Sequence, residues 1–195
     1  MNRARRLFAR ATDPEQFRLV PSGPGDVLDV GCGSKKHPGA VGIDISAHTD
    51  ADIVVDLDHP PYAELESDSF DQILCQDVIE HVSEPVRVME ELWRVARPGG
   101  RIHIRTPHFS SVLAYGDPTH RHFFSALAVR SLAEPGFAHY THVRMSVVSL
   151  SLDFWTPFRF TGIASLANRH LDVYERYFAF RFPAMNIRAE FEVRK

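Results

Sequence analysis

Short apolar runs, each closed by a polar residue or a glycine, dominate the first half of the chain. They lie at residues 27–30, 41–45, 52–56 and 70–75 and are rich in valine, isoleucine and leucine. Runs of this length, bounded by turn residues, are typical of strands that are buried on both faces of a parallel sheet. Alternation of apolar and polar residues predicts a fifth strand at 101–105, and similar patterns at 145–152 and 186–193 predict two more.

An amphipathic helix is predicted after the fourth strand. Ser83 is expected to cap it, Pro85 lies in its first turn, and the Pro98-Gly99-Gly100 sequence ends it. Its buried stripe follows helical spacing and comprises Val88, Met89, Leu92, Val95 and Ala96. A second helix is predicted over residues 125–134, followed by a turn at 135–137.

The connections between the first three strands are too short to contain helices. Only residues 34–39 separate the first strand from the second, and a similar polar link follows Ser46, whereas a parallel crossover normally needs a dozen or more residues. One face of the sheet should therefore lack its own helices. We expect a homodimer partner to cover that face, with the aromatic insert of residues 154–182 as the intramolecular alternative.

The composition fits one domain of 195 residues with a sizeable core, since 44% of the residues are hydrophobic. We expect a leading segment at 1–24 and a late region at 106–186. A net charge of −3 argues against a nucleic-acid partner. No apolar run approaches the roughly 20 residues of a membrane span, and no signal-peptide pattern opens the chain. The two cysteines, Cys32 and Cys75, favour a reducing cytoplasmic location over a disulfide framework.

Candidate ligand-binding chemistry begins at the end of the first strand. The sequence Asp29-Val30-Gly31-Cys32-Gly33 places two glycines in a turn where the backbone can approach a ligand closely. Asp44 follows near the end of the second strand and Asp56 at the end of the third. Because ligands of open α/β sheets bind outside the carboxyl ends of the strands, an acid such as Asp44 is placed to accept hydrogen bonds from ribose hydroxyls.

The order of these blocks resembles that of the class I S-adenosylmethionine (SAM) dependent methyltransferases. The resemblance covers roughly residues 26–107 and rests on 29–33, 56–57, 69–75, 80–82 and 91–104. It implies an α/β fold: a Rossmann-like seven-stranded methyltransferase sheet, mostly parallel with an antiparallel last strand, here with abbreviated first crossovers. It also implies SAM as the cofactor. The implied contacts are Asp29, Gly31, Cys32 and Gly33 at the methionine end, Asp44 at the ribose, Asp56 and Leu57 at the adenine, and Gln76 near the sulfonium.

A polar loop follows the fifth strand and is expected to face the acceptor substrate. It carries His108, His120 and His122, which are the candidates for a general base because histidine titrates near neutral pH. His120 ranks first, since Asp117 in the same loop could orient it. The loop resembles a stretch of type 11 methyltransferase domains. The spacing of the three histidines and Asp117 matches no standard set of metal ligands, and Pro118 interrupts it, so we expect no metal site. The alternative to a role in substrate binding is a loop held in place by hydrogen-bonded histidines.

The insert before the last strand is dense in aromatic residues, which form either core or an apolar lid over a lipidic or aromatic acceptor. These residues are Phe154, Trp155, Phe158, Phe160, Tyr174, Tyr177, Phe178, Phe180 and Phe182. The function expected from all these features is methyl transfer, at oxygen, to a small-molecule, glycan or lipid-linked acceptor. The alternative is a non-enzymatic SAM-binding or assembly protein. A dehydrogenase is disfavoured, since the first crossover lacks the helix start that cradles a pyrophosphate.

Overall fold

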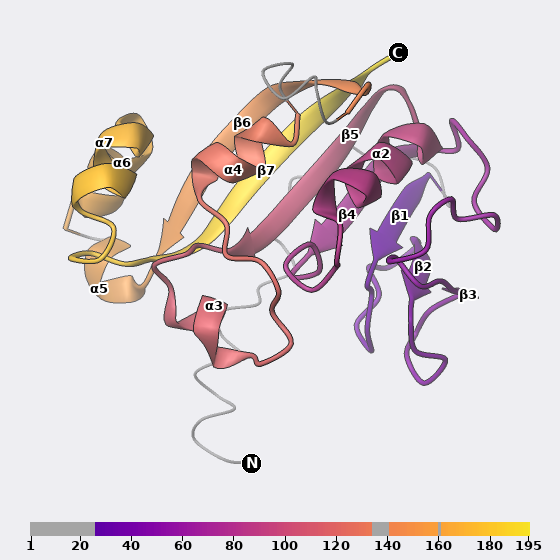
Figure 1. The fold of residues 1–195 in the computed structure, drawn as a ribbon, viewed down its shortest axis with the longest axis horizontal. Coiled ribbons are helices and arrows are strands. Elements are labelled where there is room, and N and C mark those ends of the chain that lie inside the picture. Colours follow the sequence, from indigo (N-terminus) through magenta and orange to yellow (C-terminus); the bar gives the residue numbers. More distant parts are fainter. Residues whose placement is uncertain (1–25, 134–140, 160) are drawn as a thin grey trace.

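The computed structural model describes residues 26–133, 141–159 and 161–195, and these form a seven-stranded sheet in the order β3-β2-β1-β4-β5-β7-β6 (Figure 1). The sheet comprises β1 (Val27–Val30), β2 (Val41–Asp44), β3 (Ile53–Val54), β4 (Phe70–Gln76), β5 (Ala96–Pro107), β6 (Arg144–Phe154) and β7 (Ala184–Arg194). Neighbouring strands from β3 to β5 are parallel, while β7 runs antiparallel to both β5 and β6. The predicted fold class is thus confirmed. The leading segment 1–24, the turn at 135–137 and Phe160 lie outside the described residues.

The register of the strands brings their carboxyl ends to one edge of the sheet. Val30 at the end of β1 pairs with Ile43 of β2 and with Cys75 of β4, and Gln76 pairs with Arg105 of β5. Residues that are distant in the sequence therefore meet at this edge, where ligands of open α/β sheets bind.

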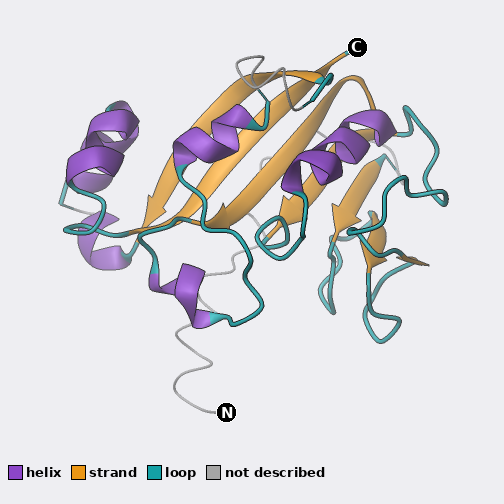
Figure 2. Ribbon diagram, viewed as in Figure 1, coloured by secondary structure: helices purple, strands orange, loops and turns teal. Residues whose placement is uncertain are grey.

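Helix α2 (Pro85–Val95) joins β4 to β5 (Figure 2). It packs Val88, Met89 and Leu92 into the core. Its predicted cap is wrong: Ser83 donates from its amide and hydroxyl to the carboxylate of Asp58, so Glu84 occupies the N-cap position without a side-chain hydrogen bond. The later helices are α3 (Val112–Gly116), α4 (Ala126–Ser131), α5 (Thr156–Arg159), α6 (Ile163–Arg169) and α7 (Leu171–Tyr177).

The short crossovers are confirmed, since residues 31–40 and 45–52 form turns and extended loops. Hydrogen bonds to strand ends take the place of packed helices. Lys36 lies 2.7 Å from Asp52, and the same carboxylate accepts from the Gly42 amide at 2.7 Å. These contacts tie the first loop to the second and to β2 between them.

The prediction that both faces of the first strands are apolar is wrong. Leu28, Val30 and Ile43 point toward α2 and belong to the main core. On the opposite face the alternate positions include Asp29, whose register neighbours are Gly42 on β2 and Leu74 on β4. The buried apolar cluster there is small and consists of Val27, Ala40 and Leu74. The described residues of this face are already buried, since Val27, Asp29 and Leu74 are at most 9% exposed, so their burial does not require a homodimer; the dimer stays a prediction.

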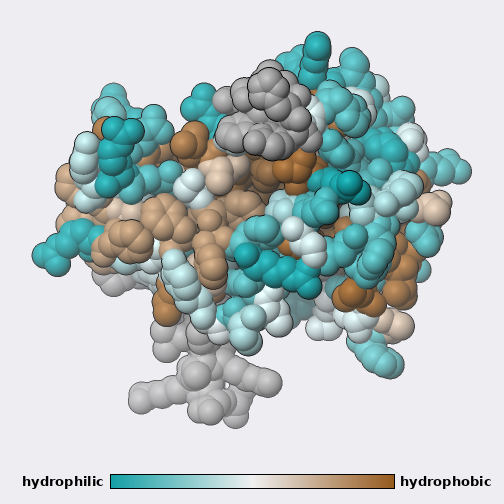
Figure 3. Space-filling model, viewed as in Figure 1, coloured by the Kyte–Doolittle hydropathy of each residue, from teal (hydrophilic) through white to brown (hydrophobic). Residues whose placement is uncertain are grey.

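The aromatic insert is divided between core and surface. Phe154 and Tyr174 are buried in the main core, while Tyr177 and Phe180 are exposed at 68% and 76%. Apolar surface gathers in the area of α3 and α5 in the space-filling view (Figure 3). On α6, Asn168 accepts from the Leu152 amide and donates to its carbonyl, which closes part of the exposed edge of β6. No helix in the described parts of the chain is long and apolar enough to cross a membrane.

His103 was expected to be partly exposed, but it is buried, with 2% of its surface accessible. It lies on the polar face of β5, where its register neighbours are Leu74 and Glu190. Burial, with a smaller contribution from the Arg101 charge, lowers the pKa of His103 to about 4. The imidazole is therefore neutral in the folded protein at pH 7.

This shift predicts a specific loss of stability in acid. The unfolded chain binds a proton at His103 near pH 6.5 and the folded chain only near pH 4, so the free energy of unfolding should fall as the pH is lowered through this window, by up to about 3 kcal/mol. Urea titrations at several pH values measure it. A His103→Gln variant should show a correspondingly smaller fall, and equal falls in both proteins would contradict the assignment.

Candidate functional site

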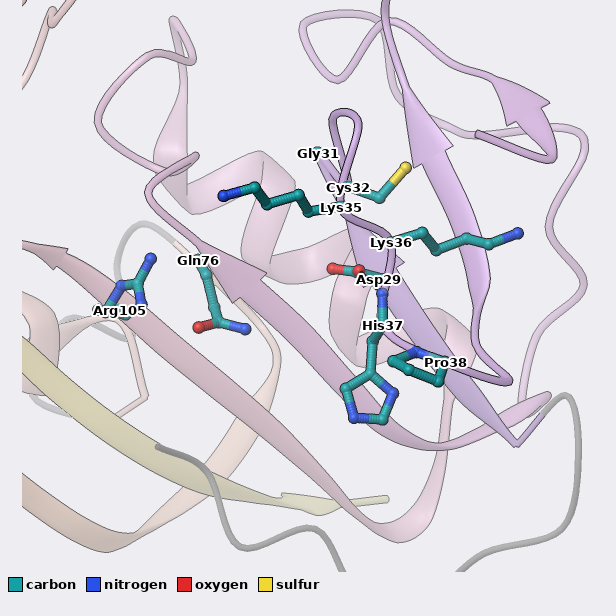
Figure 4. A pocket seen from close by; sticks show the side chains of 9 residues that line it. All are labelled: Asp29, Gly31, Cys32, Lys35, Lys36, His37, Pro38, Gln76 and Arg105. Atoms are coloured by element: carbon teal, nitrogen blue, oxygen red, sulfur yellow. Dashed lines mark hydrogen bonds between the residues drawn. The ribbon is translucent and has the colours of Figure 1, made fainter. Parts of the chain in front are cut away.

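Two cavities open at the carboxyl edge of the sheet, and both are lined by Gly31. The β1 cavity has a volume of about 390 Å³ and is lined by Asp29, Gly31, Cys32, Lys35, Lys36, His37, Pro38, Gln76 and Arg105 (Figure 4). The β2 cavity has a volume of about 340 Å³ and is lined by Gly31, Asp44, Ile45, Asp56, Leu57, Asp58, Asp77, Val78, His81, Val82 and Arg121. Each falls in the range of roughly 300–1,000 Å³ that is typical of small-ligand sites.

The structure brings together the residues predicted to bind the cofactor. Asp29, Cys32 and Gln76 line the β1 cavity, and Asp44 lines the β2 cavity together with the Asp56-Leu57 pair. Gly33 lines neither cavity, but its amide donates to Asp44 Oδ2 at 3.0 Å and so helps to position that acid.

Gly31 shapes the wall between the two cavities. Its φ of +63° lies in the left-handed region, and an added Cβ would lie 2.4 Å from Val78 Cγ2. The amides of Gly31 and Cys32 both donate to the Ile43 carbonyl, at 2.8 and 3.1 Å. Only glycine satisfies this conformation and this close approach together.

Asp29 and Cys32 differ in what they present to the β1 cavity. Asp29 is 7% exposed, accepts from the His37 amide at 2.7 Å, and has a pKa raised by burial. The Cys32 thiol points away from Asp29 and Gln76 (Figure 4) and lies near Gly42. Burial raises the pKa of Cys32 to about 11, so the thiol is neutral and the residue offers the cavity its backbone.

Backbone amides hold the other two acids in place. Asp44 accepts from Gly33 through Oδ2 and from Ser46 through Oδ1, at 3.0 and 2.9 Å. Asp56 accepts from the Asp58 amide through Oδ1 at 3.0 Å, and its Oδ2 lies 2.9 Å from Nδ1 of the exposed His59. A carboxylate offers about four lone-pair sites, so both side chains keep acceptor capacity toward the β2 cavity.

Lys35, Arg105 and Asp77 line the cavities but were not predicted. Lys35 extends toward the side of the β1 cavity formed by Gln76 and Arg105 (Figure 4). Arg105 donates to both carboxylate oxygens of Asp77, with the Nε contact at 3.0 Å. Asp77 has a left-handed φ of +56°. The only sequence signal was that Arg105 is an outward position of the fifth strand, which alternation reveals but cannot connect to Asp77.

The loop after β5 lies against the turn that follows β4. The Glu80 carbonyl accepts from the amides of Arg121 and His122, at 2.8 and 3.2 Å. The Arg121 side chain donates to Asp58 at 2.9 Å and to the Ser83 hydroxyl, and it lines the β2 cavity. The loop therefore reaches the same rim as the predicted cofactor residues.

All three candidate bases have structural partners, and none of them lines the β1 or the β2 cavity. His108 is fully buried, and its Nδ1 and Nε2 atoms contact Ser110 and Glu175 at 2.8 and 3.1 Å. These contacts pin the end of β5 to α7. His122 contacts the Ser83 carbonyl through Nε2 at 3.3 Å. Neither histidine lines the β1 or the β2 cavity, and their catalytic roles stay predictions.

His120 lies in a cluster with Glu80 and His81, which come from the turn after β4. Its Nε2 is 4.0 Å from Glu80 Oε1, and its ring packs edge-on against His81 with centroids 4.6 Å apart. Burial and the Asp77 charge raise the pKa of Glu80 to about 8. The expected partner of His120, Asp117, instead accepts from the amide and hydroxyl of Thr119.

Comparison with known proteins finds a match over the centre of the chain. Residues 28–104 match the model of a methyltransferase domain. A ubiquinone biosynthesis O-methyltransferase from Hahella chejuensis is 31% identical over 100 residues, which cover 41% of this chain and 42% of that protein. The match thus spans about two fifths of the length of this relative.

Solved structures share the fold across most of the chain. A SAM-dependent methyltransferase from Mesorhizobium loti has a TM-score of 0.56 and 14% identity, covering 89% of this chain and 93% of its own. The [4+2]-cyclase SpnF has a TM-score of 0.55 and 18% identity, covering 88% and 75%. Identities this low establish the fold alone, and the fold hosts more than one chemistry.

The two glycines of the turn should respond differently to alanine. Both have left-handed φ values, of +63° and +55°, but an added Cβ at Gly33 would meet no atom within 4 Å. Gly33→Ala should cost only backbone strain of about 1–2 kcal/mol, whereas Gly31→Ala should lose about 1–3 kcal/mol more through the contact with Val78. Denaturant unfolding of the two variants measures the difference, and equal losses would show that Val78 moves aside freely.

Proposed function

Residues 28–104 form a class I SAM-dependent methyltransferase domain, and from this premise we propose that the chain transfers a methyl group from SAM to an oxygen atom of a small-molecule, glycan or lipid-linked acceptor. One observation carries the proposal. The acids of three successive strands lie along two cavities that meet at Gly31, in the order that an elongated ligand with a charged end, a ribose and a base requires.

The charges of the β1 cavity fit the amino-acid end of SAM. Lys35 and Arg105 supply positive charge for its carboxylate, and Asp29 supplies an acceptor for its ammonium group. Gln76, at the end of β4, offers an uncharged polar side chain on the same wall. A cavity that holds both signs of charge on opposite sides suits a zwitterion better than an anion such as pyrophosphate.

The β2 cavity fits the nucleoside. Asp44 keeps lone pairs for the ribose hydroxyls after its two backbone contacts. Asp56 and Leu57 lie beyond it, at the end of β3, and Val78 adds apolar surface beside Gly31 for a base. This arrangement supports the predicted order of contacts, with ribose at Asp44 and adenine at Asp56.

SAM supplies a methyl group activated by a sulfonium centre, so the protein has to orient the acceptor and exclude water. Holding two reactants in line can remove roughly 7–11 kcal/mol of the barrier. An acceptor hydroxyl must also lose its proton. His120 is the best-placed candidate base, because its Nδ1 contacts the Ala114 carbonyl at 2.8 Å and its ring packs against His81, which lines the β2 cavity.

The non-enzymatic alternative draws its support from the short crossovers, which replace the helices that usually flank such a site. Against it stands the turn after β1, which is closed by hydrogen bonds and keeps an open cavity on each side of Gly31. The cytoplasmic location, the absence of a nucleic-acid partner and the homodimer remain predictions of the sequence.

Removing the charge of Asp44 should weaken SAM binding. Asp44→Asn preserves the shape of the side chain but loses a charge-assisted hydrogen bond to ribose, so the affinity should fall by about 1.5–3 kcal/mol, or roughly 10- to 150-fold. Calorimetry with SAM, its demethylated product and NAD measures this. Asp50→Asn, an exposed acid that lines neither cavity, is the matched control, and an unchanged affinity in Asp44→Asn would remove Asp44 from the site.

The loop after β5 should govern transfer rather than cofactor affinity. His120→Gln is expected to bind SAM within a few-fold of the original chain, while methyl transfer falls by about 10²-fold or more. The assay follows labelled methyl groups from SAM into the polar, glycan and lipid fractions of a cell extract. Transfer into none of these fractions by the original chain, despite SAM binding, would favour the non-enzymatic alternative.

A further inference from the structure

The turn after β4 and the loop after β5 build a second, smaller site beside the β2 cavity. One ligand-type atom from each of Glu80, His81 and His120 lies within 4.8 Å of the other two. Glu80 is 1% exposed, and its Oε1 atom is buried without a hydrogen-bond partner in the described structure. A buried carboxyl oxygen without a hydrogen bond, next to two imidazoles, is a polar atom that a further partner could satisfy.

Each of the three side chains is held by a partner on its far side. His120 donates from Nδ1 to the Ala114 carbonyl at 2.8 Å, which leaves the lone pair on Nε2, the atom nearest Glu80. The Thr119 hydroxyl donates to Asp117 and can accept from Nδ1 of His81 at 3.0 Å, which places the lone pair of His81 on Nε2. The Thr106 hydroxyl donates to Glu80 Oε2 at 2.9 Å, which leaves Oε1 for the cluster.

Such outer partners are typical of metal-ligating side chains. A histidine ligand almost always donates its other ring N–H to a carbonyl, carboxylate or other acceptor, which fixes the tautomer and the ring orientation. We propose that Glu80, His81 and His120 bind a divalent transition-metal cation, with the open coordination positions directed to the β2 cavity that His81 lines.

The ligand set narrows the choice of cation. Two imidazoles and one carboxylate suit Zn²⁺, Mn²⁺ or Fe²⁺ better than Mg²⁺ or Ca²⁺, which prefer oxygen ligands. Ligands about 2.1 Å from such an ion are about 3–3.5 Å apart, so the 4.0 Å between Glu80 and His120 has to close by less than about 1 Å.

A role for the cation rests on the proposed function. An acceptor hydroxyl bound at an open position would become more acidic and release its proton to water. Its oxygen would then form the new bond to the methyl carbon as the bond from that carbon to sulfur breaks. The cation would in this way supply the activation that otherwise falls to His120 as a base, and it would favour oxygen acceptors, above all those with two adjacent oxygens.

Metal binding can be tested without an acceptor. The full chain is freed of metal with a chelator and titrated with Mn²⁺, following the spectrum of the free ion by electron paramagnetic resonance, and with Zn²⁺ by calorimetry. We expect one site per chain. Glu80→Gln and His120→Gln should each weaken binding at least tenfold, and Thr119→Val, which removes the partner of His81, should weaken it about 10- to 100-fold.

His142→Gln is the matched control. His142 pairs with Glu90 at 3.7 Å on the surface, outside the cluster, so its replacement should leave the affinity unchanged. Thermal unfolding without metal establishes that each variant is folded. Absence of a stoichiometric site, or equal affinity in the original chain, Glu80→Gln and His120→Gln, would overturn the proposal.

Calorimetry with SAM in the presence of chelator separates the two proposals. SAM binding without metal binding would refute the metal site and leave the proposed function standing. A metal site in a chain that fails to bind SAM would refute the proposed function and leave the cation without its role.

Discussion

The turn between β1 and β2 is the constraint on which the site depends. With no room for a helix, the chain must reverse direction and return to the neighbouring strand through residues 31–40. The Ile43 carbonyl accepts from two successive amides, those of Gly31 and Cys32, and this contact fixes the end of β1 against β2. Gly31 makes this contact in a left-handed conformation, in which a Cβ atom would collide with Val78.

The acids of the site therefore have two tasks. Asp29 holds the His37 amide, Asp44 holds the amides of Gly33 and Ser46, and Asp52 holds Gly42 and Lys36. In a doubly wound sheet, packed helices would maintain these loops; here carboxylates that accept from the backbone do so instead. Two of the same carboxylates, Asp29 and Asp44, line the cavities, so the contacts that hold the crossovers also shape the proposed cofactor site.

Glu80, in the turn after β4, likewise makes two kinds of contact. Its carbonyl accepts from the loop amides of Arg121 and His122, while its carboxyl group faces His120. The turn after β4 therefore joins the part of the molecule proposed to bind the cofactor to the part proposed to bind the acceptor. Asp77 and Arg105 extend this junction, since their ion pair links the end of β4 to β5.

The sequence by itself determined the positions of the strands along the chain, the short crossovers and the positions of Asp29, Asp44 and Asp56, because strand periodicity, glycine turns and acids at strand ends are local signals. It did not reveal the polar face of the sheet or the burial of His103, since a short apolar run does not show which neighbours each side chain meets. Only the tertiary structure grouped Glu80 and His81 with His120, and it paired the Asp117 carboxylate with Thr119 instead of the His120 ring. These residues are distant along the chain, and their proximity follows from the packing of one loop on the end of β4.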